Sequence, residues 1–178
     1  MCTTKIICHT PLTAGWIACQ NNSAEGPFAN YFGLREDVNE AILVHGTNKD
    51  AAEGITDEDF RLNLSGSNTG TLFGRGIYLA ECVSKSDEYT EEEAGVHTVL
   101  VCRATLGRVL YTDEVGPNPD DLERRCGYNQ APGKGEYDSV LGDREKCSKT
   151  FREFIVYDDD FLYPEFIVKY RRQHWREL

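Results

Sequence analysis

Short apolar segments recur along this chain, and their spacing is the feature that most constrains its fold. They lie near residues 41–45, 76–80, 97–104, 108–111, 138–141, 153–157 and 164–170. Runs of this kind, bounded by glycine and polar residues, are typical of β-strands. Most lie too close together for the helical crossovers that join parallel strands. The sequence therefore predicts an α+β domain with two small packed sheets, mainly antiparallel, and short flanking helices.

Helical segments are expected near residues 27–39, 48–55 and 80–90. The first has apolar side chains at helical spacing, although Gly33 weakens the pattern. In the third, Cys82, Ser86 and Tyr89 fall on one face, which is apolar apart from one hydroxyl. A face with rings to stack against and a single hydrogen-bond donor suits an aromatic amide, and the alternative is an ordinary amphipathic helix.

Two segments differ from ordinary connections between strands. Residues 64–76 are rich in glycine, which predicts a mobile loop before the second strand. Residues 113–137 are polar, long and contain Pro117, Pro119 and Pro132. This second segment is either a functional flap or a tolerated insertion.

Length and charge limit what the protein can be. Its 178 residues fit one domain, with residues 1–38 as a lead-in and a core of about 39–171. Lysine and arginine total 19 against 30 aspartates and glutamates, a formal net charge of -11. This charge opposes contact with phosphate backbones, so we expect no specific nucleic-acid binding.

Cysteine usage and hydropathy bear on the cellular compartment. The 7 cysteines include no CxxC pair, and no histidine spacing is of the zinc type, so we expect reduced thiols and no metal. No apolar run approaches the ~20 residues that span a bilayer. Residues 1–20 are too interrupted for a secretory signal. We expect an intracellular protein, cytoplasmic or nuclear, without membrane association; export as an effector is the alternative.

Common nucleotide and hydrolase motifs are missing from the chain. Gly74-Arg75-Gly76 is a fragment of the dinucleotide fingerprint, without its third glycine, its helix or its acidic residue. No GxxxxGK(S/T), HExxH or GxSxG pattern occurs. A Rossmann site is therefore excluded, and triphosphate hydrolysis, zinc proteolysis and a serine nucleophile elbow lack their local requirements.

Three polar residues, His45, Tyr78 and Glu153, stand in predicted strands far apart in the sequence and can meet in one cleft. Taken alone, His45 fits an ordinary turn histidine and Tyr78 fits strand packing. Gly46 favours a binding role, because a planar ligand can approach a backbone without a Cβ and use its N–H and C=O. Glu153 begins the run Glu-Phe-Ile-Val, so it needs a partner when buried. That partner is either a ligand or an arginine or lysine.

Taken together, the segments resemble the catalytic domain of the poly(ADP-ribose) polymerase family, in the diphtheria-toxin-like branch of ADP-ribosyltransferases. The resemblance covers about residues 39–171. It rests on His45-Gly-Thr47, Phe73-Gly-Arg-Gly-Ile-Tyr78, Val83-Ser-Lys-Ser86 with Tyr89, Tyr137-Asp-Ser-Val-Leu-Gly142, Arg152-Glu-Phe-Ile-Val-Tyr157 and Tyr163-Pro-Glu-Phe166. It implies two small, mainly antiparallel sheets around an NAD cleft.

The resemblance implies that NAD is bound as a co-substrate and that no metal is needed. His45 would hydrogen-bond the adenosine ribose. The Gly46 backbone and the Ser86 hydroxyl would hold the nicotinamide carboxamide. Tyr78 and Tyr89 would sandwich the nicotinamide ring.

The same resemblance implies a catalytic set of Glu153, His45 and Tyr78. Glu153 would bind the 2'-hydroxyl of the nicotinamide ribose and orient the acceptor. Departure of nicotinamide leaves positive charge on the ribose, and a nearby carboxylate stabilises that charge. Thr47 belongs to the same motif as His45, and Arg61 is a candidate for the adenine and phosphate side.

The implied activity is NAD-dependent transfer of ADP-ribose to a protein, to the enzyme itself or to another macromolecule. The glutamate permits chain elongation, and the loop near residues 142–150 would decide between one unit and many. The loop over NAD, residues 61–74, is short, and the lead-in is too brief for an autoinhibitory helical domain, so we expect no regulation by DNA breaks. The alternatives are an NAD glycohydrolase acting as a toxin or effector, and a non-catalytic module that binds NAD or ADP-ribose.

Overall fold

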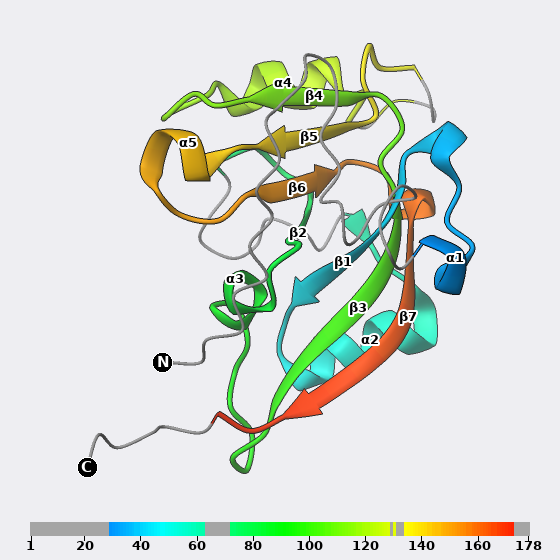
Figure 1. The fold of residues 1–178 in the computed structure, drawn as a ribbon, viewed down its shortest axis with the longest axis vertical. Coiled ribbons are helices and arrows are strands. Elements are labelled where there is room, and N and C mark those ends of the chain that lie inside the picture. The colour runs from blue at the N-terminus through cyan, green and yellow to red at the C-terminus, as the bar shows by residue number, and fades with distance from the viewer. Residues whose placement is uncertain (1–28, 63–71, 129, 131–133, 173–178) are drawn as a thin grey trace.

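The computed structural model describes residues 29–62, 72–128, 130 and 134–172 of the chain. Its strands form two sheets, one above the other in Figure 1. The upper, four-stranded sheet has the order β2 (Ile77–Leu79), β6 (Glu153–Val156), β5 (Ser139–Gly142) and β4 (Val109–Thr112). The lower, three-stranded sheet has the order β1 (Glu40–Gly46), β3 (His97–Thr105) and β7 (Leu162–Tyr170).

Strand pairing confirms the predicted fold class. Every neighbouring pair is antiparallel except β4 and β5, which run parallel. Strands β1 to β7 match the predicted segments in order and type. The protein therefore has a mixed α+β fold with two small, mainly antiparallel sheets.

The helices are short, and they pack on the faces and edges of the two sheets (Figure 1). They are α1 (Ala29–Phe32), η1 (Glu36–Val38), α2 (Lys49–Glu58), α3 (Val83–Asp87), α4 (Pro119–Arg125), α5 (Arg144–Ser148) and η3 (Asp159–Phe161). Helix α2 confirms the helix expected over 48–55. Its cap is the Asn48 side chain, which accepts a hydrogen bond from the Ala51 N–H at 2.8 Å.

Two of the expected helices are wrong in extent. The helix expected over 27–39 ends at Phe32, because Gly33 takes a left-handed φ of 60° and a separate 3-10 turn follows. The helix expected over 80–90 begins only at Val83, because the Ala80 backbone pairs with another strand and stays extended. Cys82 is therefore the N-cap of α3 and does not share a helical face with Tyr89.

Two hydrophobic clusters make up the core in the described part of the chain. The larger lies between the sheets and α2, and it includes Leu43, Leu100 and Phe154. The smaller covers the other face of the four-stranded sheet, where Leu122 and Cys126 come from the region of α4. Strands β5 and β6 are thus buried on both faces, which explains their continuous apolar runs.

Within the segment 113–137, the described helix α4 is part of the fold. It was expected to be either a flap or a tolerated insertion, yet its helix α4 contributes Leu122 to the core. The expected mobile loop over 64–76 lies mostly outside the described residues, and its last part, from Leu72 onward, leads into β2.

Within the described ranges the four cysteines are free thiols, and no three His, Cys, Asp or Glu side chains group as a metal would require. No helix of the described chain is both long and apolar enough to cross a membrane.

Replacing Gly142 by alanine should lower the free energy of unfolding by about 1–3 kcal/mol. The added Cβ would lie 2.1 Å from Cζ of Phe73, a ring that is only 1% exposed. Gly54 in α2 provides the matched control, because nothing lies within 4 Å of a Cβ there. Gly54→Ala should raise stability by about 0.5–1 kcal/mol, since glycine weakens helices. Urea titration of both variants checks the pair; equal stability of Gly142→Ala and wild type would contradict the packing described.

Candidate active site

His45 lies near the end of β1 with its ring fixed by a backbone carbonyl. Nδ1 lies 2.9 Å from the Tyr78 carbonyl oxygen, and because a carbonyl only accepts, Nδ1 carries the proton. Burial lowers the pKa of His45, which favours the neutral ring. In that tautomer Nε2 is a hydrogen-bond acceptor. The site therefore presents an acceptor that suits a sugar hydroxyl.

Gly46 allows α3 to approach the end of β1. A Cβ at this position would lie 1.8 Å from the Ser86 carbonyl oxygen. Packing of the chain therefore explains the glycine, and ligand contact through its backbone stays a prediction. Ser86 is buried, and its hydroxyl donates to the Val44 carbonyl at 2.8 Å. Because this bond uses the hydroxyl proton, Ser86 can offer a ligand only its oxygen lone pairs, as an acceptor. The sequence had predicted a hydrogen-bond donor at this position.

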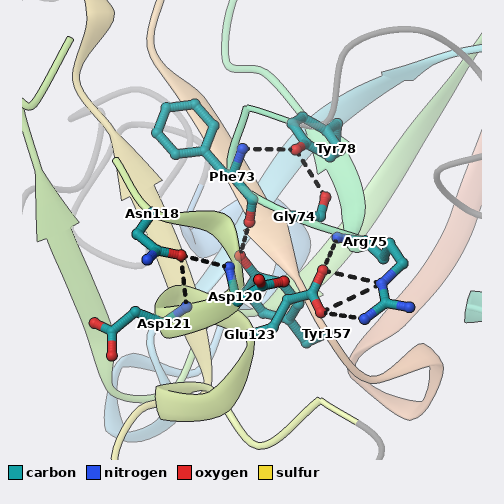
Figure 2. Close-up of polar contacts among 9 residues, drawn as sticks. All are labelled: Phe73, Gly74, Arg75, Tyr78, Asn118, Asp120, Asp121, Glu123 and Tyr157. Atoms are coloured by element: carbon teal, nitrogen blue, oxygen red, sulfur yellow. Dashed lines mark hydrogen bonds and ion pairs between the residues drawn. The ribbon is translucent and has the colours of Figure 1, made fainter. Parts of the chain in front are cut away.

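Tyr78 connects His45 with the turn that precedes β2. Its backbone carbonyl holds the His45 ring, and its hydroxyl donates to the Gly74 carbonyl at 2.9 Å. The same hydroxyl accepts from the Phe73 N–H at 3.0 Å (Figure 2). Burial raises the pKa of Tyr78, so the phenol stays protonated and keeps both bonds. The tyrosine is therefore held at both its backbone and its hydroxyl.

Glu153 opens β6 and is only 3% exposed. Its carboxylate accepts from the Tyr89 hydroxyl at 3.3 Å. Lys85 Nζ lies 3.5 Å from Oε1, and Arg144 Nη1 lies 3.7 Å from Oε2. Of the two partners that the sequence allowed for a buried Glu153, a ligand or a basic side chain, the basic side chains are therefore present. All these contacts are longer than the ~2.7–2.9 Å of strong charge-assisted bonds, so the oxygens keep capacity for a ligand hydroxyl.

Tyr89 follows α3 and is half-exposed beside the Glu153 carboxylate. Lys85 Nζ lies 4.7 Å from the centre of its ring. Burial opposes the charge on Lys85, but contacts with Glu88, Tyr89 and Glu153 outweigh it, so the pKa of Lys85 lies above its ordinary value. Burial also raises the pKa of both Tyr78 and Tyr89, and the charge of Glu153 adds to each shift. The bond from Tyr89 to Glu153 and the pairing of Tyr78 with Ile155 place these side chains in one region.

Two further predicted residues lie at the margin of this region. Thr47 is half-buried between β1 and the cap of α2. Arg61 is exposed and pairs with Glu58 at 2.5 Å, while the neighbouring Phe60 ring packs edge-on against His45. Their roles toward NAD stay predictions, as does the covering loop over 61–74, which lies largely outside the described residues.

The sequence did not reveal a buried ion pair beside Glu153. Arg152 Nε and Nη2 lie 2.7 and 2.6 Å from Glu81 Oε1, and both side chains are buried. Burial raises the pKa of Glu81, although Arg152 counteracts this, and Oε2 has no partner among the described atoms. The pair joins the start of β6 to the segment before α3, so it fixes the backbone that carries Glu153. Only the β2–β6 register could have indicated it, since continuing that register by two residues sets residue 81 opposite residue 152.

Two small sheets joined beside His45, Tyr78 and Glu153 define a fold of the ADP-ribosyltransferase class. The family model described as the poly(ADP-ribose) polymerase catalytic domain matches residues 20–172. The chain therefore belongs to this family, as the resemblance of its motifs suggested.

Relatives of the chain include enzymes named for both forms of transfer. It is 29% identical over 174 residues to poly(ADP-ribose) polymerase 1 of Arabidopsis thaliana, which covers 85% of this chain and 18% of the relative. It is 26% identical over 133 residues to the human protein mono-ADP-ribosyltransferase PARP12, covering 75% and 17%. A tankyrase of Caenorhabditis elegans is 36% identical over 91 residues, covering 50% and 4%. The chain thus spans less than a fifth of the length of these relatives.

Replacing Arg152 by methionine should lower the free energy of unfolding by about 3–5 kcal/mol, because the buried Glu81 carboxylate loses its counter-charge. Arg35 is the matched control, since it forms an ion pair with Asp37 and both side chains are 65% exposed. Arg35→Met should leave the unfolding midpoint unchanged within error. Thermal and urea unfolding of both variants provide the measurement. Equal effects of the two substitutions would show that the Arg152–Glu81 pair does not support the fold.

Proposed function

We propose that this chain is an NAD-dependent ADP-ribosyltransferase that releases nicotinamide and transfers ADP-ribose to a macromolecular acceptor. The observation that carries the proposal is the gathering of His45, Tyr78 and Glu153 at the junction of two sheets in a member of this family. A protein side chain, including one of the enzyme's own, is the acceptor class we favour. The relatives bear the names of both poly- and mono-transferring enzymes, so the number of units is a separate question.

The groups present at the site fit NAD in type. Nε2 of His45 is an acceptor for a ribose hydroxyl, and the Ser86 oxygen can accept from a carboxamide. The Tyr78 and Tyr89 rings supply aromatic surface near the same place. The Glu153 carboxylate supplies negative charge and an acceptor for a second ribose hydroxyl. Together these groups address both ribose units and the nicotinamide.

The proposed chemistry is substitution at the anomeric carbon of the nicotinamide ribose. The carbon–nitrogen bond to nicotinamide breaks, and its electron pair leaves with nicotinamide. A nucleophilic atom of the acceptor bonds to the same carbon and gives up its proton to solvent or a nearby base. Positive charge develops on the ribose after the old bond has weakened and before the new bond is complete. Glu153 stabilises this charged transition state more than it stabilises the bound substrate.

Glu153→Gln should bind NAD but lose about a hundredfold in rate, because one electrostatic contact of this kind contributes about 3 kcal/mol. The assay follows nicotinamide release and the mass of the protein, with wild type alongside. Glu36→Gln is the matched control, since Glu36 is an exposed carboxylate in η1, before the start of β1 and away from His45 near the end of that strand. It should keep wild-type activity. Full activity of Glu153→Gln would refute the role assigned to Glu153.

The products of the wild-type reaction separate the remaining alternatives. Added mass on protein supports the transferase, and a ladder on a denaturing gel shows chain elongation. Free ADP-ribose without protein modification would instead indicate a glycohydrolase. NAD binding without nicotinamide release would indicate a binding module.

Tyr89→Ala should weaken NAD binding roughly fivefold, because a stacking surface worth about 1 kcal/mol is removed. Calorimetric titration in a Glu153→Gln background gives the affinity without turnover. Tyr163→Ala is the control, since that tyrosine is exposed on β7, and it should bind NAD normally. Unchanged affinity in the Tyr89 variant would remove this ring from the site.

A further inference from the structure

The carboxylate of Glu123 holds the turn formed by Gly74, Arg75 and Gly76. Glu123 lies on α4, and its Oε1 accepts from the Arg75 N–H at 2.6 Å. The Arg75 guanidinium adds a bond from Nη2 to Oε2 at 2.7 Å (Figure 2). The Glu123 side chain is 7% exposed, so its carboxylate is shielded from water, whereas the Arg75 side chain is 56% exposed. One carboxylate therefore binds both the backbone and the side chain of the turn.

The two glycines of this turn have separate packing roles. Gly74 has a φ of 92°, and a Cβ there would lie 2.7 Å from Cγ of Glu123. A Cβ on Gly76 would lie 2.3 Å from Cγ2 of Ile155 in β6. The turn is thus shaped to accept Glu123 on one side and the four-stranded sheet on the other. This accounts for the glycines that resembled a fragment of a dinucleotide fingerprint.

The same turn carries the bonds that hold the Tyr78 hydroxyl. Figure 2 shows the turn between that hydroxyl, bonded to Phe73 N and Gly74 O, and the Glu123 carboxylate. Tyr157 also donates to the Phe73 carbonyl. Displacement of the turn would therefore move the partners of the Tyr78 hydroxyl directly.

Glu123 is well suited to hold the turn in place. Burial works against its charge, but hydrogen bonds from Arg75 outweigh burial, so the pKa of Glu123 lies below its ordinary value. The neighbouring Leu122 is buried in the smaller core cluster, which anchors α4. The carboxylate thus stays charged and sits on a fixed support.

We propose that Glu123 is a positioning residue for the NAD site, which acts by holding the turn that fixes Tyr78. The segment 113–137 would then serve substrate binding without touching the substrate. This inference rests on the proposed function, because it assigns the turn a role in binding the nicotinamide ring.

The test compares Glu123→Gln with Glu136→Gln. The control makes the same chemical change in the same segment, where Glu136 pairs with Arg125 and is exposed. In Glu123→Gln we expect KM and Kd for NAD to rise about fivefold to tenfold, with kcat within about twofold, because preorganisation of the binding site is lost. A merely structural role would lower kcat through the folded fraction and leave KM unchanged. Glu136→Gln should match wild type in all three constants.

A structural readout accompanies the kinetics. Hydrogen exchange at the Arg75 and Phe73 amides should accelerate in Glu123→Gln and not in Glu136→Gln, since their partners are loosened. Arg75→Met should raise Kd less than Glu123→Gln, because the bond from the Arg75 N–H remains.

The outcomes separate this inference from the proposed function. If wild type binds NAD and Glu123→Gln binds it equally well, the positioning role is overturned while the proposed function stands. If wild type neither binds nor consumes NAD, the proposed function is overturned and this inference with it. Weaker binding in Glu123→Gln, with faster exchange at the turn, supports the positioning role.

Discussion

One short backbone bridge joins the two sheets, and the candidate site is built around it. The Val44 N–H donates to the Ala80 carbonyl at 2.8 Å, and the Ala80 N–H donates back at 2.9 Å. The Val44 carbonyl also accepts from the Ser86 hydroxyl, which ties α3 to the same point. His45 follows Val44 directly on β1, and Tyr78 lies on β2 two positions before Ala80. Glu153 comes to the same place from β6, where its neighbour Phe154 pairs with Leu79, so the geometry of the site follows from the way the sheets meet.

The same junction concentrates buried charge. Continuing the β2–β6 register past the bridge sets Glu81 opposite Arg152, and Glu153 comes next in β6. Lys85 and Arg144 offset the charge of Glu153 at 3.5 and 3.7 Å. The Arg152–Glu81 contacts are much shorter, at 2.6 and 2.7 Å. The short pair stabilises the backbone, while the looser contacts leave Glu153 able to accept a further hydrogen bond.

Sequence patterns indicated the strands well, because each strand is an apolar run that packing buries on one or both faces. They failed where a tertiary contact overrides local preference: α3 is short because Ala80 belongs to the bridge, and Gly46 serves the approach of α3. His45, Tyr78 and Glu153 could be predicted as site residues because they stand in short strand motifs, and the structure brings all three to the junction of the sheets. The Arg152–Glu81 pair and the role of Glu123 depend on register and on a turn, and neither leaves a periodic signal in the sequence.

The elements on the two sides of Glu153 differ in how strongly hydrogen bonds and burial hold them in place. Toward β1 and β2, His45 and Tyr78 are held by backbone carbonyls and by a turn that α4 supports. On the other side, Arg144 reaches Glu153 from the five-residue helix α5, which has no buried residue. Changes in α5 can therefore alter the surroundings of Glu153 at little cost to the core, whereas changes near the bridge disturb both sheets. If the proposed function holds, we expect substitutions near the bridge to weaken NAD binding together with stability, and substitutions in α5 to change the choice of acceptor with little loss of stability.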